Sequence, residues 1–265
     1  MRLREKSGAK GSWMDKRAQV TIFIIMAIII VGALLVYFLW QKPSTVTGGA
    51  KRTGFDGCVD DVIKQEIESL GLSGGMIQPE LTYMYNSENF VYLCYTNLYH
   101  TACVNQKPFL KQAFEESLLR VSKEKITNCY KNSMSELQSK GYDISSSEPN
   151  INISLVPSEV IVSINAGTTV SRTSENTQYL NDFTVKTNSP IYNMLIVSTS
   201  IIQYETNLGD TDTSALAVYY PDFSFNKVKR SDGTKVYVVQ DRSSKVKFQF
   251  ATRSFALPAG YDVSS

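Results

Sequence analysis

A run of 21 residues without a charged side chain, residues 20–40, constrains this chain more than any other feature of its sequence. The run reads VTIFIIMAIIIVGALLVYFLW. At about 1.5 Å of rise per residue, a helix of this length spans the roughly 30 Å hydrocarbon core of a bilayer. A buried helix of a globular core would show a polar face, and this run shows none. We therefore predict a transmembrane helix over residues 19–40, with the lipid bilayer as its partner.

The charges on either side of this run predict its orientation. Residues 1–18 hold six Lys or Arg against two acidic residues, a net charge of +4, and no such excess follows the run. Because Lys and Arg favour the cytoplasmic side, we expect residues 1–18 to be a basic cytoplasmic segment and the C-terminal domain to be extracellular. This describes a single-pass protein of the cell membrane.

A cleaved secretory signal explains the apolar run less well than a membrane anchor does, and the folded part gives little support to a nucleic-acid partner. A cleaved secretory signal would have an apolar region of about 7 to 15 residues and a small-residue cleavage site, and no such site follows Trp40. A nucleic-acid partner needs clustered Lys and Arg on the folded part of the chain. The chain carries +2 in total, which leaves −2 for residues 19–265, so we expect no nucleic acid as a partner.

The residues that precede the apolar run carry a resemblance to a known family. The string KRAQVT, residues 16–21, is similar to the class III signal of archaeal type IV pilin-like proteins. The resemblance implies cleavage between Ala18 and Gln19, with the anchor left in place, and makes a pilin-like filament subunit the alternative function. The sequence departs from many pilins at Phe23, where they carry Glu, and at Pro43, which interrupts the helix.

The longer string MDKRAQVTIFIIMAIII, residues 14–30, resembles the N-termini of single-pass surface proteins of small-genome archaea. In those proteins a short extracytoplasmic helix begins with Cys and ends in a Gly-Gly turn, as residues 58–75 do here. This resemblance implies a location and supplies no activity. Met14 stands four residues before the expected cut, so Met1 and Met14 are both candidates for the true start.

The sequence that follows the apolar run predicts an α+β ectodomain with helices first and antiparallel strands later. Residues 41–57 are rich in Gly, Ser and Thr and indicate a flexible tether. Residues 58–147 form a helical, cysteine-containing part, and residues 148–265 form a strand-rich part. Helices are expected over residues 58–71, 108–141 and, less clearly, 190–208; strands flank turns at Pro157-Ser158 and Asp232-Gly233, and a half-buried strand covers residues 245–255.

The four cysteines all follow the apolar run, and an even number in an oxidising compartment predicts two disulfides. Three pairings are open. We favour Cys58 with Cys129, which would tie the two first helices, and Cys94 with Cys103, which would close a small loop. Zinc held by Cys103 and His100 is the competing interpretation, but no short C-x-x-C pair supports it, so we expect no metal.

Three short patterns mimic catalytic motifs. Residues 71–75 match G-x-S-x-G, but a predicted helix precedes them where a strand is needed, so we interpret them as a helix-terminating turn. Ser122 and Lys125 form an S-x-x-K pair, which we place on a solvated helix face. The aspartate pairs 60–61 and 210–212 fit helix starts or loops. We nominate no catalytic, cofactor-binding or metal residue.

These observations favour an extracytoplasmic interaction or structural protein of the cell surface over a membrane-anchored hydrolase. Fifteen tyrosines and many Ser, Thr and Asn residues suit a surface that binds a protein or a glycan, and they would equally suit a tyrosine-rich core.

Overall fold

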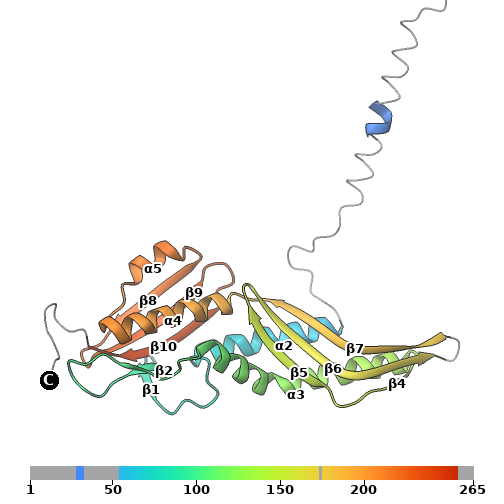
Figure 1. Ribbon diagram of the computed structural model, residues 1–265, viewed down its shortest axis with the longest axis horizontal. Helices are drawn as coiled ribbons and strands as arrows, with labels where there is room; N and C mark the ends of the chain where they lie inside the picture. Colours follow the sequence, from blue (N-terminus) through green and yellow to red (C-terminus); the bar gives the residue numbers. More distant parts are fainter. Residues whose placement is uncertain (1–27, 33–53, 173–174, 256–265) are drawn as a thin grey trace, which may run out of the picture. The chain divides into compact units, whose positions relative to one another are not determined.

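The computed structural model describes residues 28–32, 54–172 and 175–255, and for residues 172 and 175–181 it describes the backbone alone. Residues 1–50 and 51–265 form two separate units. Figure 1 shows the described elements of the second unit as two sheets with helices packed along them.

In the first unit the description is limited to a short helical stretch, residues 28–32. The side chains of Ile28, Ile29 and Ile30 are more than half exposed. No helix within the described ranges is both long enough and apolar enough to cross a bilayer. The basic segment 1–18, the site between Ala18 and Gln19, and most of the helix 19–40 and the tether 41–57 lie outside the described residues and stay predictions.

Two of the expected helices are confirmed as α2 (Phe55–Leu72) and α3 (Leu110–Ser139). α2 begins three residues before Cys58, so it starts inside the stretch predicted to be tether. Gly54 explains this start, because its φ of 83° is a backbone conformation that only glycine adopts without strain and that a helix excludes.

The six-stranded sheet has the order β1-β2-β10-β9-β8, with β3 paired to β2. All its pairs are antiparallel except β2 with β10, which is parallel. Its strands are β1 (Thr82–Tyr85), β2 (Glu88–Tyr95), β3 (Val104–Asn105), β8 (Phe223–Lys229), β9 (Thr234–Asp241) and β10 (Lys247–Arg253). The predicted hairpin at Asp232-Gly233 is confirmed as the β8–β9 turn.

The expectation of a half-buried strand over residues 245–255 is wrong in its burial. β10 is central in its sheet, and five consecutive residues, 248–252, are buried. Phe248 and Phe250 face the main core, whereas Ala251 packs in a smaller tyrosine-lined cluster on the other face. As a polar residue, Gln249 was expected to face solvent, but it is buried and its side-chain amide donates to the Leu72 carbonyl at 3.0 Å.

The four-stranded antiparallel sheet is built on β6, which pairs along its length with β7 on one side and with β5 and then β4 on the other. Its strands are β4 (Asp143–Ser145), β5 (Asn150–Val156), β6 (Glu159–Arg172) and β7 (Glu175–Asn188). The predicted turn at Pro157-Ser158 is confirmed as the β5–β6 connection. Figure 1 shows α2 and α3 lying along this sheet.

Two further helices, α4 (Ile191–Leu208) and α5 (Thr213–Tyr219), follow β7 and precede β8 in the sequence. α4 confirms the helix favoured for residues 190–208, and Gly209 ends it with a φ of 72°. α5 was not predicted. The predicted order, with helices first and antiparallel strands later, therefore describes the chain only coarsely, because α4 and α5 interrupt the strands.

One main core joins these elements. Its members are apolar side chains of α2, α3, α4 and both sheets, among them Ile63, Phe114, Leu118, Ile201 and Phe250. The packing of α2 on β10 is so close that a Cβ added at Gly71 would lie 2.2 Å from the Lys247 carbonyl oxygen. Because β2 and β10 share a sheet, residues of both predicted parts, 58–147 and 148–265, build this unit.

Candidate binding site

Both disulfides that we favoured are confirmed. Cys58 on α2 is bonded to Cys129 on α3, with their Cα atoms 5.9 Å apart, and Cys94 is bonded to Cys103, at 5.4 Å. His100 lies exposed in the loop that the second bond closes. Thiols in disulfides do not ligate zinc, and the described part of the chain gathers no group of three His, Cys, Asp or Glu side chains that could hold a metal.

The G-x-S-x-G match is confirmed as a helix-terminating turn. Ser73 is the C-cap of α2, and its hydroxyl donates to the carbonyls of Leu70 at 3.2 Å and Met76 at 2.8 Å. Gly74 and Gly75 follow with φ of 62° and 79°. A hydroxyl held by two carbonyls at the end of a helix is not the exposed nucleophile that this motif requires.

The expectation of a solvated face for the S-x-x-K pair holds for Lys125 and is wrong for Ser122. Ser122 is fully buried in α3, and its hydroxyl donates to the Leu118 carbonyl at 2.6 Å. Lys125 is half-exposed and forms an ion pair with Glu66 of α2 at 2.5 Å. The error has a simple cause: Ser122 lies one helical turn from both Leu118 and Ile126, so it continues the buried stripe of α3.

Asp60, Asp210 and Asp212 have structural partners, whereas Asp61 is exposed, and the expectation that Asp60 and Asp61 open a helix is wrong because α2 begins at Phe55. Asp60 pairs with Lys64 one helical turn later, at 2.8 Å. Asp212 is the N-cap of α5, and its carboxylate accepts from the backbone N–H groups of Ser214 and Ala215. These hydrogen bonds lower the pKa of Asp212 below its ordinary value.

Side chains of α4, β9 and β10 form a buried ionic cluster that we did not predict from the sequence. Glu205 is fully buried, and its carboxylate accepts from Lys235 at 2.7 Å, from the Tyr237 hydroxyl at 2.5 Å and from the Thr252 hydroxyl at 3.2 Å. Burial and the negative charge of Glu205 raise the pKa of Tyr237, so the phenol remains a donor. The polar groups of the cluster are engaged with one another, which makes it a structural element.

Asp210 joins this cluster to the surface. Its carboxylate pairs with Lys227 and, at 2.5 Å, with Lys229, and one oxygen lies 3.9 Å from the Lys235 nitrogen. Burial alone would raise the pKa of Asp210, but the hydrogen bonds from Lys227 and Lys229 and the nearby positive charges lower it to about 2. Together with Asp212, which lines the same surface, Asp210 balances the charges of Lys227 and Lys229.

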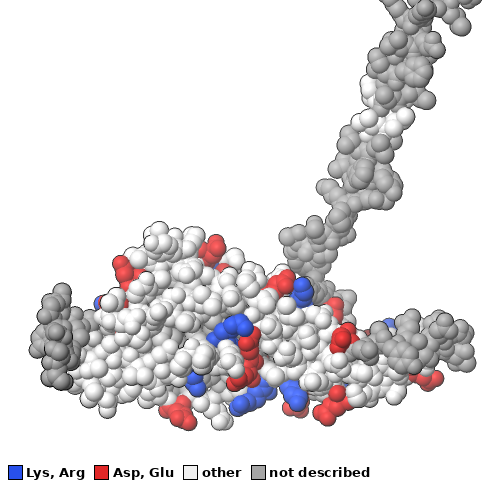
Figure 2. All heavy atoms as spheres, viewed as in Figure 1, with Lys and Arg blue, Asp and Glu red and all other residues white. Residues whose placement is uncertain are grey.

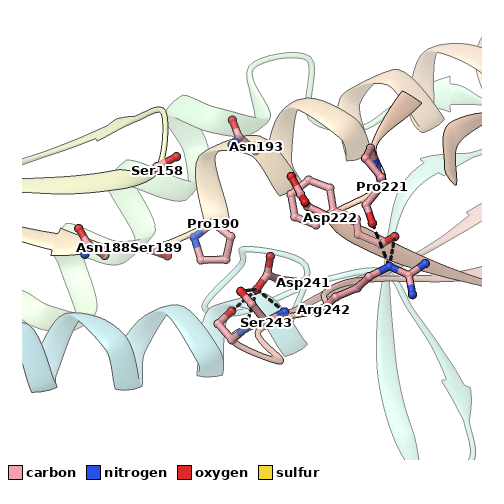
Figure 3. A pocket seen from close by; sticks show the side chains of 12 residues that line it. Ser158, Asn188, Ser189, Pro190, Asn193, Pro221, Asp222, Asp241, Arg242 and Ser243 are labelled. Carbon is pink, nitrogen blue, oxygen red and sulfur yellow. Dashed lines mark hydrogen bonds between the residues drawn. The ribbon is translucent and has the colours of Figure 1, made fainter. Parts of the chain in front are cut away.

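A polar pocket of about 450 Å³ lies where the β5–β6 turn and the end of β7 approach the β9–β10 turn (Figure 3). One oxygen of Asp241 accepts four hydrogen bonds, from the backbone and hydroxyl groups of Ser243 and Ser244, at 2.6 to 3.2 Å. Burial would raise the pKa of Asp241, but these bonds lower it. Arg242 donates to the carbonyls of Pro221 and Phe223. The side chains of Asp241 and Arg242 thus form hydrogen bonds with the loops that build this pocket.

A second concavity, which we name the α4–α5 groove, consists of two adjoining hollows of about 490 and 550 Å³. Tyr204 of α4 and Leu216 and Tyr219 of α5 line both. The first hollow is completed by Ser200, Gln203, Asn207 and Tyr220. The second is completed by Leu208, Asp210, Thr211, Asp212, Thr213, Ala215, Lys227 and Lys229.

Two tyrosines of the α4–α5 groove, Tyr204 and Tyr219, are exposed and make no specific side-chain contact in the described part of the chain, whereas the third, Tyr220, packs against the main core. Tyr204 is 49% exposed and Tyr219 is 78% exposed, and neither side chain has a hydrogen bond, ring contact or cation contact within the described residues. Other tyrosines are engaged: Tyr92 bonds to Thr234, and Tyr237 stacks on Phe250. Exposed aromatic rings without a structural partner in a concave site are typical of a binding surface.

Comparison with family models, with curated proteins and with solved structures finds no match to this chain. The groove therefore has to be interpreted from its own geometry. Sequence reasoning noted the many tyrosines and missed the groove, because α5 was not expected. Asp212 followed by T-S-A-L was the available signal, since Asp is a preferred N-cap residue.

Proposed function

We propose that this chain is a membrane-anchored extracytoplasmic protein of the cell surface that binds a partner through its α4–α5 groove and does not act as an enzyme. The observation that carries the proposal is the pair of exposed, unpartnered rings, Tyr204 and Tyr219, in a concave site. Binding sites expose aromatic rings because a ring covers a large contact area at small entropic cost.

The location in this proposal rests on the sequence and the disulfides. Residues 20–40 are apolar enough to anchor the chain, and the basic residues before them favour a cytoplasmic N-terminus. Two disulfides tie the second unit, and such bonds persist in oxidising, extracytoplasmic compartments.

Binding is favoured over catalysis because the candidate nucleophiles are engaged in structure. The hydroxyls of Ser73 and Ser122 donate to backbone carbonyls, and the carboxylates of Glu205 and Asp241 accept hydrogen bonds from their neighbours. On the face in Figure 2, basic and acidic side chains are interspersed and large areas carry neither, which gives no electrostatic support to a nucleic-acid partner.

A filament subunit is the second candidate, and it rests on the pilin-like signal at residues 16–21. Packing in such a filament needs an N-terminal helix that continues into the folded domain. Gly54 is non-helical immediately before α2, which favours a tethered domain over a continuous helix. Recovery of the protein in filaments sheared from intact cells would favour the filament subunit, and retention in the membrane fraction would favour the anchored form.

The groove is tested with the full chain in lipid nanodiscs and envelopes isolated from cells that carry the protein. We expect the wild type to bind these envelopes and the variant Tyr204→Ala/Tyr219→Ala to lose binding by about tenfold or more. Phe109→Ala is the matched control, because Phe109 is an exposed aromatic residue (76%) at the start of α3. Equal binding by all three proteins would contradict the proposal.

A further inference from the structure

We infer that the α4–α5 groove recognises an uncharged glycan of the cell envelope. This inference names the ligand class of the proposed binding site and rests on the proposed function. The first hollow combines two exposed tyrosine rings with neutral polar side chains and has no charged residue among its lining. A neutral sugar presents both apolar C–H faces and hydroxyl groups, so it needs both kinds of contact.

The polar groups of the hollow match sugar hydroxyls in chemistry. Gln203 and Asn207 lie on α4 about one turn apart, and each carboxamide can donate and accept hydrogen bonds. Ser200 stands one turn earlier; its hydroxyl donates to the Ile196 carbonyl at 3.2 Å and can still accept. Neither amide has a side-chain partner within the described residues, so both are free to bind a ligand.

The rings supply the apolar contact. Tyr204 and Tyr219 come from different helices and line the same hollow, which Leu216, only 6% exposed, also lines. An aromatic face packs well against the C–H face of a pyranose ring, and a tyrosine hydroxyl can bond to the sugar at its edge. Volumes of about 490 and 550 Å³ fall within the range of small-ligand sites, and the adjoining hollows suit consecutive sugars of a chain.

The charges of the second hollow argue against an acidic or basic ligand. Lys227 and Lys229 are paired with Asp210, and Asp212 is occupied as the N-cap of α5. An ionic ligand would have to displace these pairs. A partner helix of another protein would need a continuous apolar face, and the α4 side of the groove is polar at three of its positions, Ser200, Gln203 and Asn207.

The test uses the full chain in nanodiscs, isolated envelopes, and a competitor made by exhaustive proteolysis of those envelopes, which keeps glycans and destroys protein epitopes. We expect this competitor to abolish binding of the protein to envelopes, equally at low and high salt. Periodate treatment of the competitor, which cleaves sugar diols, should remove this effect. Tyr204→Phe should retain binding within about threefold, because the ring is kept, whereas Tyr204→Ala should lose about tenfold and Phe109→Ala none.

Other outcomes separate this inference from the proposed function. Tyrosine-dependent envelope binding that the proteolysed competitor does not block would mean a protein partner, which overturns the glycan inference and leaves the proposed function in place. Competition that weakens steeply as salt rises would mean a charged ligand and also overturns the inference. Absence of any tyrosine-dependent envelope binding overturns both.

Discussion

Lys235 is the residue whose loss should cost the fold most, because it is the cation of a buried ionic cluster. Its nitrogen contacts Glu205 at 2.7 Å and also donates to the carbonyls of Gly209, at the end of α4, and Ser254, after β10. Lys235→Met would leave the Glu205 carboxylate buried without its cation. We predict a loss of about 3 to 5 kcal/mol in the free energy of unfolding, measured by chemical denaturation of the full chain in detergent.

The double variant Lys235→Met/Glu205→Leu is the informative control. Replacing both members of a buried ion pair by apolar residues of similar size is often close to neutral, so most of the stability should return. A single variant within about 1 kcal/mol of the wild type, or a double variant as unstable as the single one, would contradict the role assigned to the cluster.

Asp210 makes stability depend on pH in a defined direction. Its pKa in the folded chain is about 2, below the ordinary value of 3.8, so its ion pairs stabilise the fold above about pH 4 and this contribution is lost as pH falls towards 2. We predict that Asp210→Asn is less stable than the wild type at neutral pH and that the difference shrinks at about pH 2. Denaturation curves at both pH values check this, with the exposed Asp61→Asn as control. A difference that grows on acidification would contradict it.

At the scale of elements, the sequence predicted what periodicity and local stop signals encode. α2 and α3 followed from apolar stripes bounded by glycines, and the β8–β9 hairpin followed from Asp232-Gly233. The burial of β10 did not follow, because its Lys and Gln residues alternate with apolar ones as in an edge strand. On its second face Ala251 packs in a cluster with β1 and β2 tyrosines that are distant in the sequence, and no local pattern reports such a contact.

The packing of α2 on β10 gives a prediction at the element scale. Gly71→Ala would place a methyl group 2.2 Å from the Lys247 carbonyl oxygen, which is backbone and cannot rotate away. We predict a loss of about 1 to 3 kcal/mol, because either the helix or the strand must shift. Ser69→Ala, at an exposed position of the same helix, should change stability by less than about 0.5 kcal/mol. Equal stability of the two variants would mean that α2 does not approach β10 this closely.

The two disulfides should contribute unequally. Cys58 and Cys129 are 71 residues apart, whereas Cys94 and Cys103 are 9 apart, and a longer closed loop restricts the unfolded chain more. Replacing the first pair by serines should cost about 4 kcal/mol and replacing the second about 2 to 3 kcal/mol. Thermal denaturation without reductant measures both. A larger loss for the Cys94–Cys103 pair would show that the entropy of the unfolded chain does not decide how much each disulfide stabilises the fold.

At the scale of the whole molecule, the sequence predicted the class and the cysteine pairing, and it missed the parts that depend on distant contacts. The favoured pairing held because the cysteines of each pair lie on elements that the sequence already suggested. The parallel pairing of β2 with β10 joins residues near 92 and 251, and the α4–α5 groove depends on how the short helix α5, which was not predicted, packs beside α4. Both arise from tertiary packing, which leaves little trace in local pattern.

The proposed display of the folded domain outside the membrane is tested most directly by adding protease to intact cells and following both ends of the chain with terminal tags. If the basic segment 1–18 stays in the cytoplasm and residues 19–40 span the bilayer, the C-terminal tag should be lost from intact cells, once reductant loosens the disulfide-tied domain, while the N-terminal tag survives on a membrane-bound fragment. The N-terminal tag should become accessible only after the cells are lysed. Protection of the C-terminal tag in intact cells, together with its digestion after lysis, would contradict the extracytoplasmic location.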